Sequence, residues 1–592
     1  MTSDKVIRIG GGSAFFIDSA LAVPQLLGAG VDYIILDYLA EGAMGMMGRM
    51  RLADPDSGFP SDFMDVHIGP FLTQIAQTGT KIVSNAGAVN PGRLAHLLRG
   101  KIAELGLSLK VAAIEGDCLM HRLADFAATR DMFTGKAFPQ KGVTSANAYL
   151  GAFPIARALA QGADIVITGR VVDSALALGP LIHEFGWGPD DLDQLAGGTL
   201  AGHMIECGAQ VTGGTFTDWH EVEGWANIGS PIAECHSDGR CIITKPEGTG
   251  GLVSFGTCAE QMLYEVSDPA AYLVPDVACD FSHVTMEEVG KDRVLVKGAI
   301  GNSKPEKLKA CATWDDGWRA VAYQPVIGRP ALQKAAKQAE ALFERGRNLL
   351  RARNLADWRR TEAVMIGATG NPASEEVVVK LVVEHDEMLA VQMFAREQFS
   401  AISAMAPGTS VAFGVQVQPC MGLVSFLVPR DDLEVTIDVG DGAEPFSEPI
   451  TLHAELTPSP MVQSKPQVGE AEAVLNQVVG DGVGEAELTI FDLAYTRSGE
   501  KGETINIGVI ARKPENLPAL RAALTPELLR AHLTDLGDFK VTIYEVPGIH
   551  ALNIVLDGAL PGGLNASQRL DPAAKSVGQR LATMAIPCRR QS

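Results

Sequence analysis

Short apolar runs alternate with helix-patterned stretches over the first 190 residues. The runs "KVIRI", "VDYIILD", "TKIVSNA", "LKVAAIEGD" and "DIVITG" are rich in β-branched residues and largely apolar, which is typical of strands buried on both faces. Between them, stretches such as "NPGRLAHLLRGKIAEL" and "SANAYLGAFPIARALAQGA" read as helices. This alternation predicts an α/β fold with a mostly parallel, Rossmann-like sheet covered by helices on both faces.

Three polar residues stand where the predicted helices begin. Asp18, Asn90 and Asp173 can each act as an N-cap, because a short polar side chain can accept a hydrogen bond from the first turn. Pro91 suits the first helical position.

The rest of the chain predicts two further parts. The parallel-sheet core covers about residues 1–210, and residues 211–445 mix the strand patterns "GRCIITK", "RVLVKGAIG", "RAVAYQPVIG", "VVVKLVVEH" and "SVAFGVQVQ" with a long helix, "PALQKAAKQAEALFERGRNLLRARN". We interpret this second stretch as an α+β elaboration, so that one domain spans 1–445. A proline-rich acidic stretch at 446–474 has the composition of a linker. Residues 475–592 predict a small α+β domain.

Composition excludes several classes of protein. The net charge of −22 argues against nucleic acid or an anionic membrane surface as a partner, since both require basic residues. There is no signal-peptide pattern at the start and no uninterrupted apolar stretch of about 18 residues. The nine cysteines include no CxxC pair, which indicates a reduced, cytoplasmic protein. Cys235, His236 and Cys241 fit no standard zinc spacing, so we expect no metal site.

Polar residues collect where the predicted parallel strands end. In open α/β sheets, ligands bind outside the carboxyl ends of the strands. The residues that follow the five strands in turn are Ser13, then Asp37 and Glu41, then Asn85, then Asp117, then Arg170 and Asp173. We expect them to line one site.

Roles within this expected site follow from residue type. Asp37, Glu41 and Asp117 are the candidate acid–base groups. Arg170 is a candidate anchor for an anionic substrate, since its planar fork matches a carboxylate or phosphate. The alternative is a structural ion pair of Arg170 with Asp173 or Asp37. Asn85 and Asp173 are expected to contact the substrate.

The turn "GGGSAF" after the first strand resembles a phosphate-binding turn. Gly11, Gly12 and Ser13 would present bare backbone N–H groups to an anion. The dinucleotide fingerprint is incomplete, because Phe15 stands where its last glycine belongs. The alternative is a tight connection with no ligand.

The stretch "GHMIECGAQ" places His203 and Cys207 on one helical face. A cysteine beside a histidine is the minimum for a thiolate nucleophile. However, Gly208 predicts that Cys207 lies at a helix C-terminus, where the negative end of the dipole disfavours a thiolate. We therefore expect Cys207 to pack or to line the substrate site rather than to act as the nucleophile.

Several of these stretches together resemble the acyclic terpene utilisation (AtuA) family. They are "IGGGSAFFIDS", "LDYLAEGAM", "NAGAVNPG", "ANAYLGAFPIARALAQGADIVITGRVVDSALALGP", "GHMIECGAQVTGGTFTDW", "EQMLYEVSDPAAYLVPDV" and "YTRSGEKGETINIGV". The resemblance covers nearly the whole chain and implies a large N-terminal domain followed by a small ferredoxin-like C-terminal domain. Glu500 and Glu503 stand where the family often has aspartate, a departure that bears on the geometry of that loop.

The resemblance also implies a function. The family accompanies the breakdown of citronellol and geraniol through branched acyl-CoA intermediates, and a lyase or hydratase role is suggested for it. We therefore expect a cytoplasmic, homo-oligomeric enzyme acting on a branched or unsaturated carboxylate or acyl-CoA, with CoA entering only as part of the substrate and with no cofactor. Two alternatives stay open: a nucleotide- or dinucleotide-dependent enzyme that uses the glycine turn, and a non-catalytic partner of other pathway enzymes.

Overall fold

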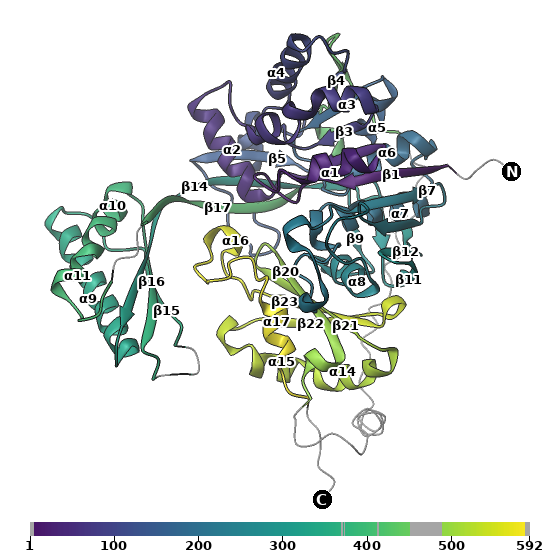
Figure 1. The fold of residues 1–592 in the computed structure, drawn as a ribbon. Coiled ribbons are helices and arrows are strands. Elements are labelled where there is room, and N and C mark those ends of the chain that lie inside the picture. Colours follow the sequence, from purple (N-terminus) through teal and green to yellow (C-terminus); the bar gives the residue numbers. More distant parts are fainter. Residues whose placement is uncertain (1–4, 369–370, 372, 411–413, 450–487, 587–592) are drawn as a thin grey trace, which may run out of the picture.

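The computed structural model describes residues 5–368, 371, 373–410, 414–449 and 488–586. It consists of a body, a lobe that projects from it, and a C-terminal domain packed below the body (Figure 1). Most of the linker expected at 446–474, and the first residues of the segment expected at 475–592, lie outside the described residues.

Five parallel strands form the centre of the body. They lie in the order β1-β2-β3-β6-β4. Their bounds are Val6–Gly11 (β1), Tyr33–Leu36 (β2), Lys81–Ser84 (β3), Ile165–Thr168 (β6) and Val111–Glu115 (β4). Every residue of β2 and of β6 is buried, as the apolar runs predict.

Antiparallel strands extend this sheet at both edges, so the fold is mixed α/β. The 11-stranded sheet within the described residues runs β11-β12-β8-β7-β1-β2-β3-β6-β4-β18-β19. The added strands are Ile232–His236 (β7), Cys241–Thr244 (β8), Thr285–Gly290 (β11), Arg293–Lys297 (β12), Thr436–Asp438 (β18) and Ala443–Pro445 (β19). This order also differs from the Rossmann order 3-2-1-4-5-6, because the later parallel strands β6 and β4 join beyond β3 and not beside β1.

Helices cover both faces of the sheet, and each face has its own apolar core. On one face lie Phe153–Ala160 (α5), Ala175–Phe185 (α6), Leu192–Ile205 (α7) and Phe255–Leu263 (α8). On the other lie Ala22–Ala29 (α1), Glu41–Ala53 (α2), Leu72–Thr78 (α3) and Pro91–Glu104 (α4). No described helix has the length and apolar character that a membrane crossing needs.

The predicted caps are wrong in detail. Helix α1 begins at Ala22, and Asp18 instead accepts hydrogen bonds from the N–H groups of Ala14 and Ser19. Asn90 occupies the N-cap position of α4, but its side chain donates to the carbonyls of Pro55 and Ser57. Asp173 pairs with an arginine instead of capping α6. In each case the side chain interacts with a group outside the first turn of the helix.

The start of the helix predicted in "SANAYLGAFPIARALAQGA" is a strand. Residues Val143–Ala148 form β5, which pairs antiparallel with β14 (Lys307–Ile327). Helix α5 begins only at Phe153. Pairing with a strand more than 150 residues away overrides the helical propensity of the alanines in this stretch.

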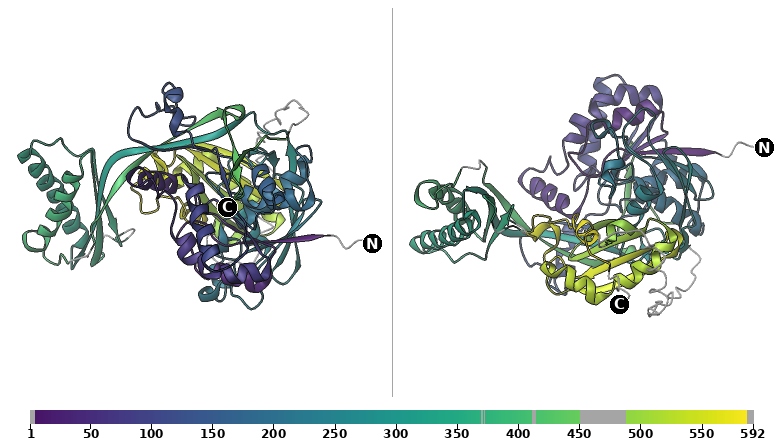
Figure 2. Two further views of the ribbon diagram at one scale, coloured as in Figure 1. Left: turned by 90° about the horizontal axis from the view of Figure 1, so that it is seen from above. Right: turned by 60° about the horizontal axis from the view of Figure 1, so that its bottom comes forward.

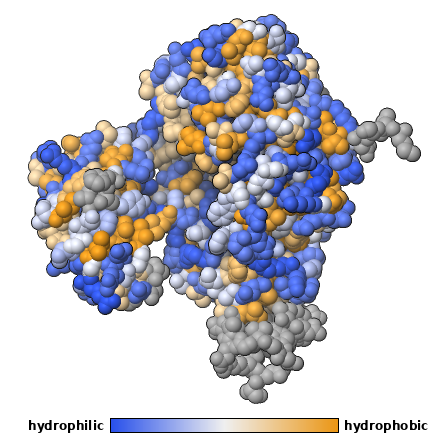
Figure 3. Space-filling view, in the orientation of Figure 1, coloured by the Kyte–Doolittle hydropathy of each residue, from blue (hydrophilic) through white to orange (hydrophobic). Residues whose placement is uncertain are grey.

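Two long strands carry the lobe. β14 and β17 (Gln416–Pro429) leave the body side by side and end in the lobe sheet, as the further views show (Figure 2). Arg360–Ile366 (β15) and Glu376–His385 (β16) complete that sheet, and Ala331–Ala352 (α9), Met388–Glu397 (α10) and Ala401–Ala404 (α11) accompany it. The lobe stands beside the body, and polar and apolar side chains are interspersed over this face (Figure 3).

The C-terminal domain is ferredoxin-like. Its elements are Ala494–Lys501 (β20), Thr504–Ala511 (β21), Leu517–Ala523 (α14), Pro526–His532 (α15), Lys540–Val546 (β22), Ala551–Asp557 (β23) and Val577–Ala582 (α17). The antiparallel order β20-β21-β23-β22 corresponds to a βαββαβ unit whose last strand has moved to the front. The domain docks on the body through buried polar contacts: the Asn506 and Asn553 side-chain amides donate to the carbonyls of Leu263 and Val266.

Candidate functional site

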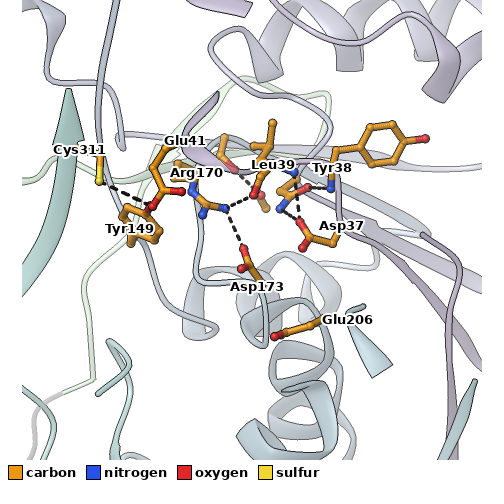
Figure 4. A network of polar contacts seen from close by, with 12 residues as sticks. Asp37, Tyr38, Leu39, Glu41, Tyr149, Arg170, Asp173, Glu206 and Cys311 are labelled. Atoms are coloured by element: carbon orange, nitrogen blue, oxygen red, sulfur yellow. Dashed lines mark hydrogen bonds and ion pairs between the residues drawn. The ribbon is translucent and has the colours of Figure 1, made fainter. Parts of the chain in front are cut away.

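Arg170 lies at the centre of a polar region at the carboxyl edge of the parallel strands. It follows β6 and is 4% exposed. Its Nη1 donates to the Leu39 carbonyl and to Asp173 Oδ1, both at 2.8 Å, and the guanidinium lies 4.3 Å from the centre of the Tyr149 ring (Figure 4). Asp173 is thus its ion-pair partner. Arg170 Nε is buried and has no hydrogen-bond partner among the residues that the structure describes, so this N–H group is available to a ligand.

Asp37, Asn85 and Ser13 form a buried support next to Arg170. Asp37 Oδ1 accepts from Asn85 Nδ2 at 2.6 Å and from the Leu39 N–H at 3.2 Å, and Ser13 Oγ donates to the Asp37 carbonyl at 2.8 Å. Burial and the neighbouring charge of Asp173 raise the pKa of the Asp37 carboxyl well above its usual range. The ends of β1, β2 and β3 therefore lie together, as the sequence predicts. Their polar side chains, however, hydrogen-bond to the backbone and to one another.

Asp117 has the same supporting position under Arg170. Its Oδ2 accepts from the Arg170 backbone N–H at 2.8 Å and from Asn147 Nδ2 at 2.7 Å. Burial raises its pKa to about 6. A side chain at Gly169 would collide with this carboxylate, since an added Cβ would lie 2.4 Å from Oδ1. Asp117 thus fixes the course of the chain after β6.

Glu41 faces outward from this support, at the start of α2. It accepts from the Tyr149 hydroxyl at 2.5 Å and from Lys309 Nζ at 3.1 Å. Burial raises the pKa of the Glu41 carboxyl, but the charges of Lys309 and Arg170 outweigh it and hold that pKa well below its usual range. Glu41 is therefore an ionised carboxylate between two cations. A cavity of about 10 Å³ behind it, bordered by Asn147 and Cys311, has room for about one water.

The C-terminal domain brings further charges to the same place. Lys501, at the end of β20, pairs with Glu265 at 2.8 Å, and its charge acts on the Glu41 carboxyl. The preceding Glu500 is affected by burial and by the charges of Glu265 and Glu41, which raise its pKa to about 8. The Lys501 side chain remains 47% exposed. Lys501 thus keeps access to solvent while its charge acts on the Glu41 carboxyl.

We use the name junction cluster for six of these residues: Glu41, Arg170, Asp173, Lys309, Glu500 and Lys501. They come from the ends of β6 and β20, the start of α2, the strand β14 and the turn before α6. Sequence reasoning missed Lys309, Glu500 and Lys501 as site residues. The signal for the last two was the charged "GEKGE" between two strand patterns, which belongs to the family-like motif.

The glycine turn is packed rather than open to an anion. The Gly11 N–H donates to the Pro231 carbonyl at 2.9 Å and the Gly12 N–H to the Ile35 carbonyl at 2.8 Å. An added Cβ at Gly11 would lie 2.1 Å from the Ile205 carbonyl oxygen, which explains the glycine there. No helix starts directly after the turn, because α1 begins at Ala22. The N–H groups of Gly11 and Gly12 are therefore not available to an anion, and the expected anion-binding turn is wrong. The two glycines instead border a cavity of about 240 Å³.

Cys207 follows the C-terminus of α7, as the sequence predicts. Burial is the main cause that raises the pKa of the Cys207 thiol, and the charge of Glu206 raises it further. Both causes oppose formation of the thiolate. His203 is engaged elsewhere: its Nδ1 lies 3.0 Å from Glu206 Oε1 and its Nε2 lies 3.1 Å from the Met262 carbonyl. His203 therefore cannot serve Cys207 as a base in this arrangement. Within the ranges that the structure describes, no three His, Cys, Asp or Glu side chains are placed to hold a metal ion.

Comparison with protein-family models accounts for most of the chain. Residues 7–439 match the model described as acyclic terpene utilisation family protein AtuA, and residues 488–587 match the model of the AtuA ferredoxin-like domain. A comparison with curated proteins finds no match. The junction cluster draws residues from both matched regions.

Proposed function

The chain belongs to the acyclic terpene utilisation family AtuA, and from this premise we propose that it is a cytoplasmic catabolic enzyme. Its proposed substrate is a branched or unsaturated carboxylate or the CoA thioester of such an acid. The proposed reaction is the addition of water to this substrate or the cleavage of one of its carbon–carbon bonds. The family's description supports a role in acyclic terpene utilisation. The class of reaction is argued from the residues of the junction cluster.

The observation that carries the proposal is the pairing of opposed charges around Glu41, where the charge of a lysine from the C-terminal domain also acts. Arg170, Lys309 and Lys501 supply three cations, which suit a carboxylate or an enolate oxygen. Glu41 and Glu500 supply two carboxyl groups in different protonation states at neutral pH. Environments that push two pKa values apart are a recurring arrangement for a general base and a general acid.

Hydration of a conjugated double bond illustrates the roles. Glu41, ionised, takes a proton from water as the water oxygen bonds to the β-carbon. The electron pair of the double bond moves toward the carbonyl, where Arg170 and the lysines stabilise the developing negative charge. Glu500, protonated below its pKa of about 8, then delivers a proton to the α-carbon. Both carboxyl groups return to their starting states by exchange with solvent.

The proposal revises the roles expected from the sequence: Glu41 keeps its acid–base role, Glu500 replaces Asp37 and Asp117, and Arg170 keeps the role of anchor. The glycine turn gives no support to a dinucleotide-dependent enzyme, since the Gly11 and Gly12 N–H groups are bonded within the protein.

The test is an activity screen with purified full-length protein. Branched α,β-unsaturated carboxylates and their CoA thioesters are supplied as substrates, and loss of conjugated absorbance together with mass change reports hydration or cleavage. The proposal predicts turnover of at least one compound by the wild type and loss of turnover in Glu41→Gln and Glu500→Gln. Glu527→Gln is the matched control, since Glu527 also lies in the first turn of a helix, α15. Turnover that survives both cluster substitutions would remove the assigned acid and base.

A further inference from the structure

The small cavity behind Glu41 lies between a helix and a pair of strands. One wall is the ladder of β5 and β14, in which Asn147 pairs with Cys311 and Ser145 pairs with Thr313. Residues that pair across an antiparallel ladder share one face of it, and all four of these residues border the cavity. The other wall is the start of α2, where Glu41 lies. The cavity is therefore a gap between α2 and the ladder, of a size that suits one water.

Two glycines of α2 limit the extent of this gap. An added Cβ at Gly48 would collide with the Thr144 carbonyl, and one at Gly45 would collide with the Met421 side chain. The helix therefore lies directly against the strands at these two positions. Glu41 is on the same face of the helix, because residues 41, 45 and 48 recur at intervals of four and three. The close packing at the glycines thus confines the gap to the start of the helix, beside Glu41.

Two buried polar atoms of residues that border the cavity have no hydrogen-bond partner among the described residues. They are Asn147 Oδ1, an acceptor, and Arg170 Nε, a donor. The two residues are 3% and 4% exposed. The orientation of the Asn147 amide is fixed, because its Nδ2 donates to the Asp117 carboxylate at 2.7 Å and a carboxylate accepts. Because a buried polar atom without a partner is costly, an open donor and an open acceptor at one small cavity indicate a polar ligand.

Glu41 supplies a third polar group to the cavity. The hydrogen bonds that described residues donate to its carboxylate, from Tyr149 (Figure 4), Lys309 and Cys311, all end on Oε1. Its Oε2 is therefore available to a ligand. A water that contacts Glu41 Oε2, Asn147 Oδ1 and Arg170 Nε would have about three partners, which is the usual number for a buried water.

We propose that this cavity binds the water that the reaction adds to the substrate. The inference rests on the proposed function, and it selects hydration from the two reaction classes named there. The water donates to Glu41 Oε2 and to Asn147 Oδ1 and accepts from Arg170 Nε, which leaves one lone pair of its oxygen for the β-carbon of the double bond.

The reaction then uses each of these contacts. As the carbon–oxygen bond forms, the proton that faces Glu41 passes to Oε2 and the π electron pair moves toward the substrate carbonyl. The α-carbon afterwards takes its proton from Glu500, as proposed above. Asn147 is thus a catalytic residue because it contacts the reacting water. Asp117 is a positioning residue, since it holds the Asn147 amide in the required orientation.

A crystal structure of the full-length protein tests the water site without any substrate. Electron density for a water within hydrogen-bond distance of Glu41 Oε2, Asn147 Oδ1 and Arg170 Nε is expected in the wild type. This water should be lost in Asn147→Leu, in which the side chain keeps a similar shape but has no acceptor. A wild-type cavity without such a water, or a water that contacts only Ser145 and Thr313, would overturn the proposal, whether or not the variant folds.

The kinetics of a compound that the activity screen identifies test the role of this water. Asn147→Leu should lower kcat by about 10²-fold while KM changes little, because Asn147 acts on the water and not on the substrate. Asn516→Leu is the matched control. Asn516 is also buried, and its Nδ2 donates to the Leu493 carbonyl within the C-terminal domain. This variant should lose stability but keep the kcat of the wild type.

Two further outcomes separate this inference from the proposed function. Wild-type kcat in Asn147→Leu, with turnover still lost in Glu41→Gln, would overturn the water site and leave the assigned base in place. Absence of turnover with every compound, together with a water at the three atoms in the crystal, would count against the proposed function but support the water site.

Discussion

Two layers of polar residues at the same edge of the sheet differ in their exposure to solvent and in the partners of their side chains. In the inner layer, Asp37, Asn85 and Asp117 are buried, and their side chains hydrogen-bond to backbone N–H groups and to neighbouring amides. In the outer layer, Glu41 and Lys309 are 25% and 33% exposed and pair with each other. A polar residue at a strand end is therefore not enough to mark a reactive group. Solvent access together with a charged partner from another element separates the outer layer from the inner one.

The largest effect should follow substitution in the outer layer. Glu41→Gln removes the ionised carboxylate while keeping its shape, so turnover should fall by about 10²- to 10⁴-fold, the usual contribution of a general base. The melting temperature should fall somewhat, because the charge interactions of Glu41 with Lys309 and Arg170 are lost, but the protein should stay folded because Lys309 can be solvated where it lies. Glu527→Gln should retain wild-type turnover. Activity within a few-fold of wild type in Glu41→Gln would place the base elsewhere.

The inner layer should respond in stability. Asp117→Ala leaves the Arg170 N–H and Asn147 Nδ2 without their acceptor, which should lower the free energy of unfolding by about 2–5 kcal/mol. Urea unfolding measures this, with the exposed Asp190→Ala expected within about 0.5 kcal/mol of wild type. If Asp117→Ala unfolds at the wild-type midpoint, Asp117 does not brace the chain and the contrast between the layers fails.

A smaller effect concerns pH. Glu500 has a pKa raised to about 8 by burial and by the charges of Glu265 and Glu41, and the proposed role requires its protonated form. Turnover should hold at neutral pH and then fall about tenfold for each pH unit above about 8, because the proton is lost there. Glu500→Gln should show low turnover without this alkaline limb. An alkaline limb of the same midpoint in Glu500→Gln would assign it to another group.

Much of the body could be predicted from its hydrophobic pattern. The strands of the parallel core are apolar runs because both faces are covered, and such runs are visible in "YIIL" and "IVIT" alone. Strand β5 was missed because its partner β14 lies more than 150 residues away, and local propensity contains no information on that pairing. The strand order also depends on long-range pairing, so the Rossmann-like expectation went further than a local pattern allows.

The candidate site could be predicted only in part for the same reason. Asp37, Asn85 and Arg170 come together because adjacent parallel strands end at one edge, which is a consequence of the sheet. Lys309 pairs with Glu41 across 268 residues, and Lys501 enters from a separate domain. No spacing in the sequence connects these residues. The sequence also does not show which backbone N–H groups already have a hydrogen-bond partner. The carbonyls that accept from Gly11 and Gly12 can be identified only in the three-dimensional structure.

If both domains contribute to the site, replacing a cation of either domain should weaken the binding of a carboxylate. Octanoate is titrated calorimetrically into wild type, Arg170→Met and Lys501→Met, with Lys513→Met as an exposed lysine control in the same domain as Lys501. Arg170→Met and Lys501→Met should each weaken binding by about tenfold or more, a change of about 1.4 kcal/mol, while Lys513→Met should bind as wild type does. Wild-type affinity in Lys501→Met, together with lost affinity in Arg170→Met, would show that the C-terminal domain does not contribute and would confine the site to the large domain.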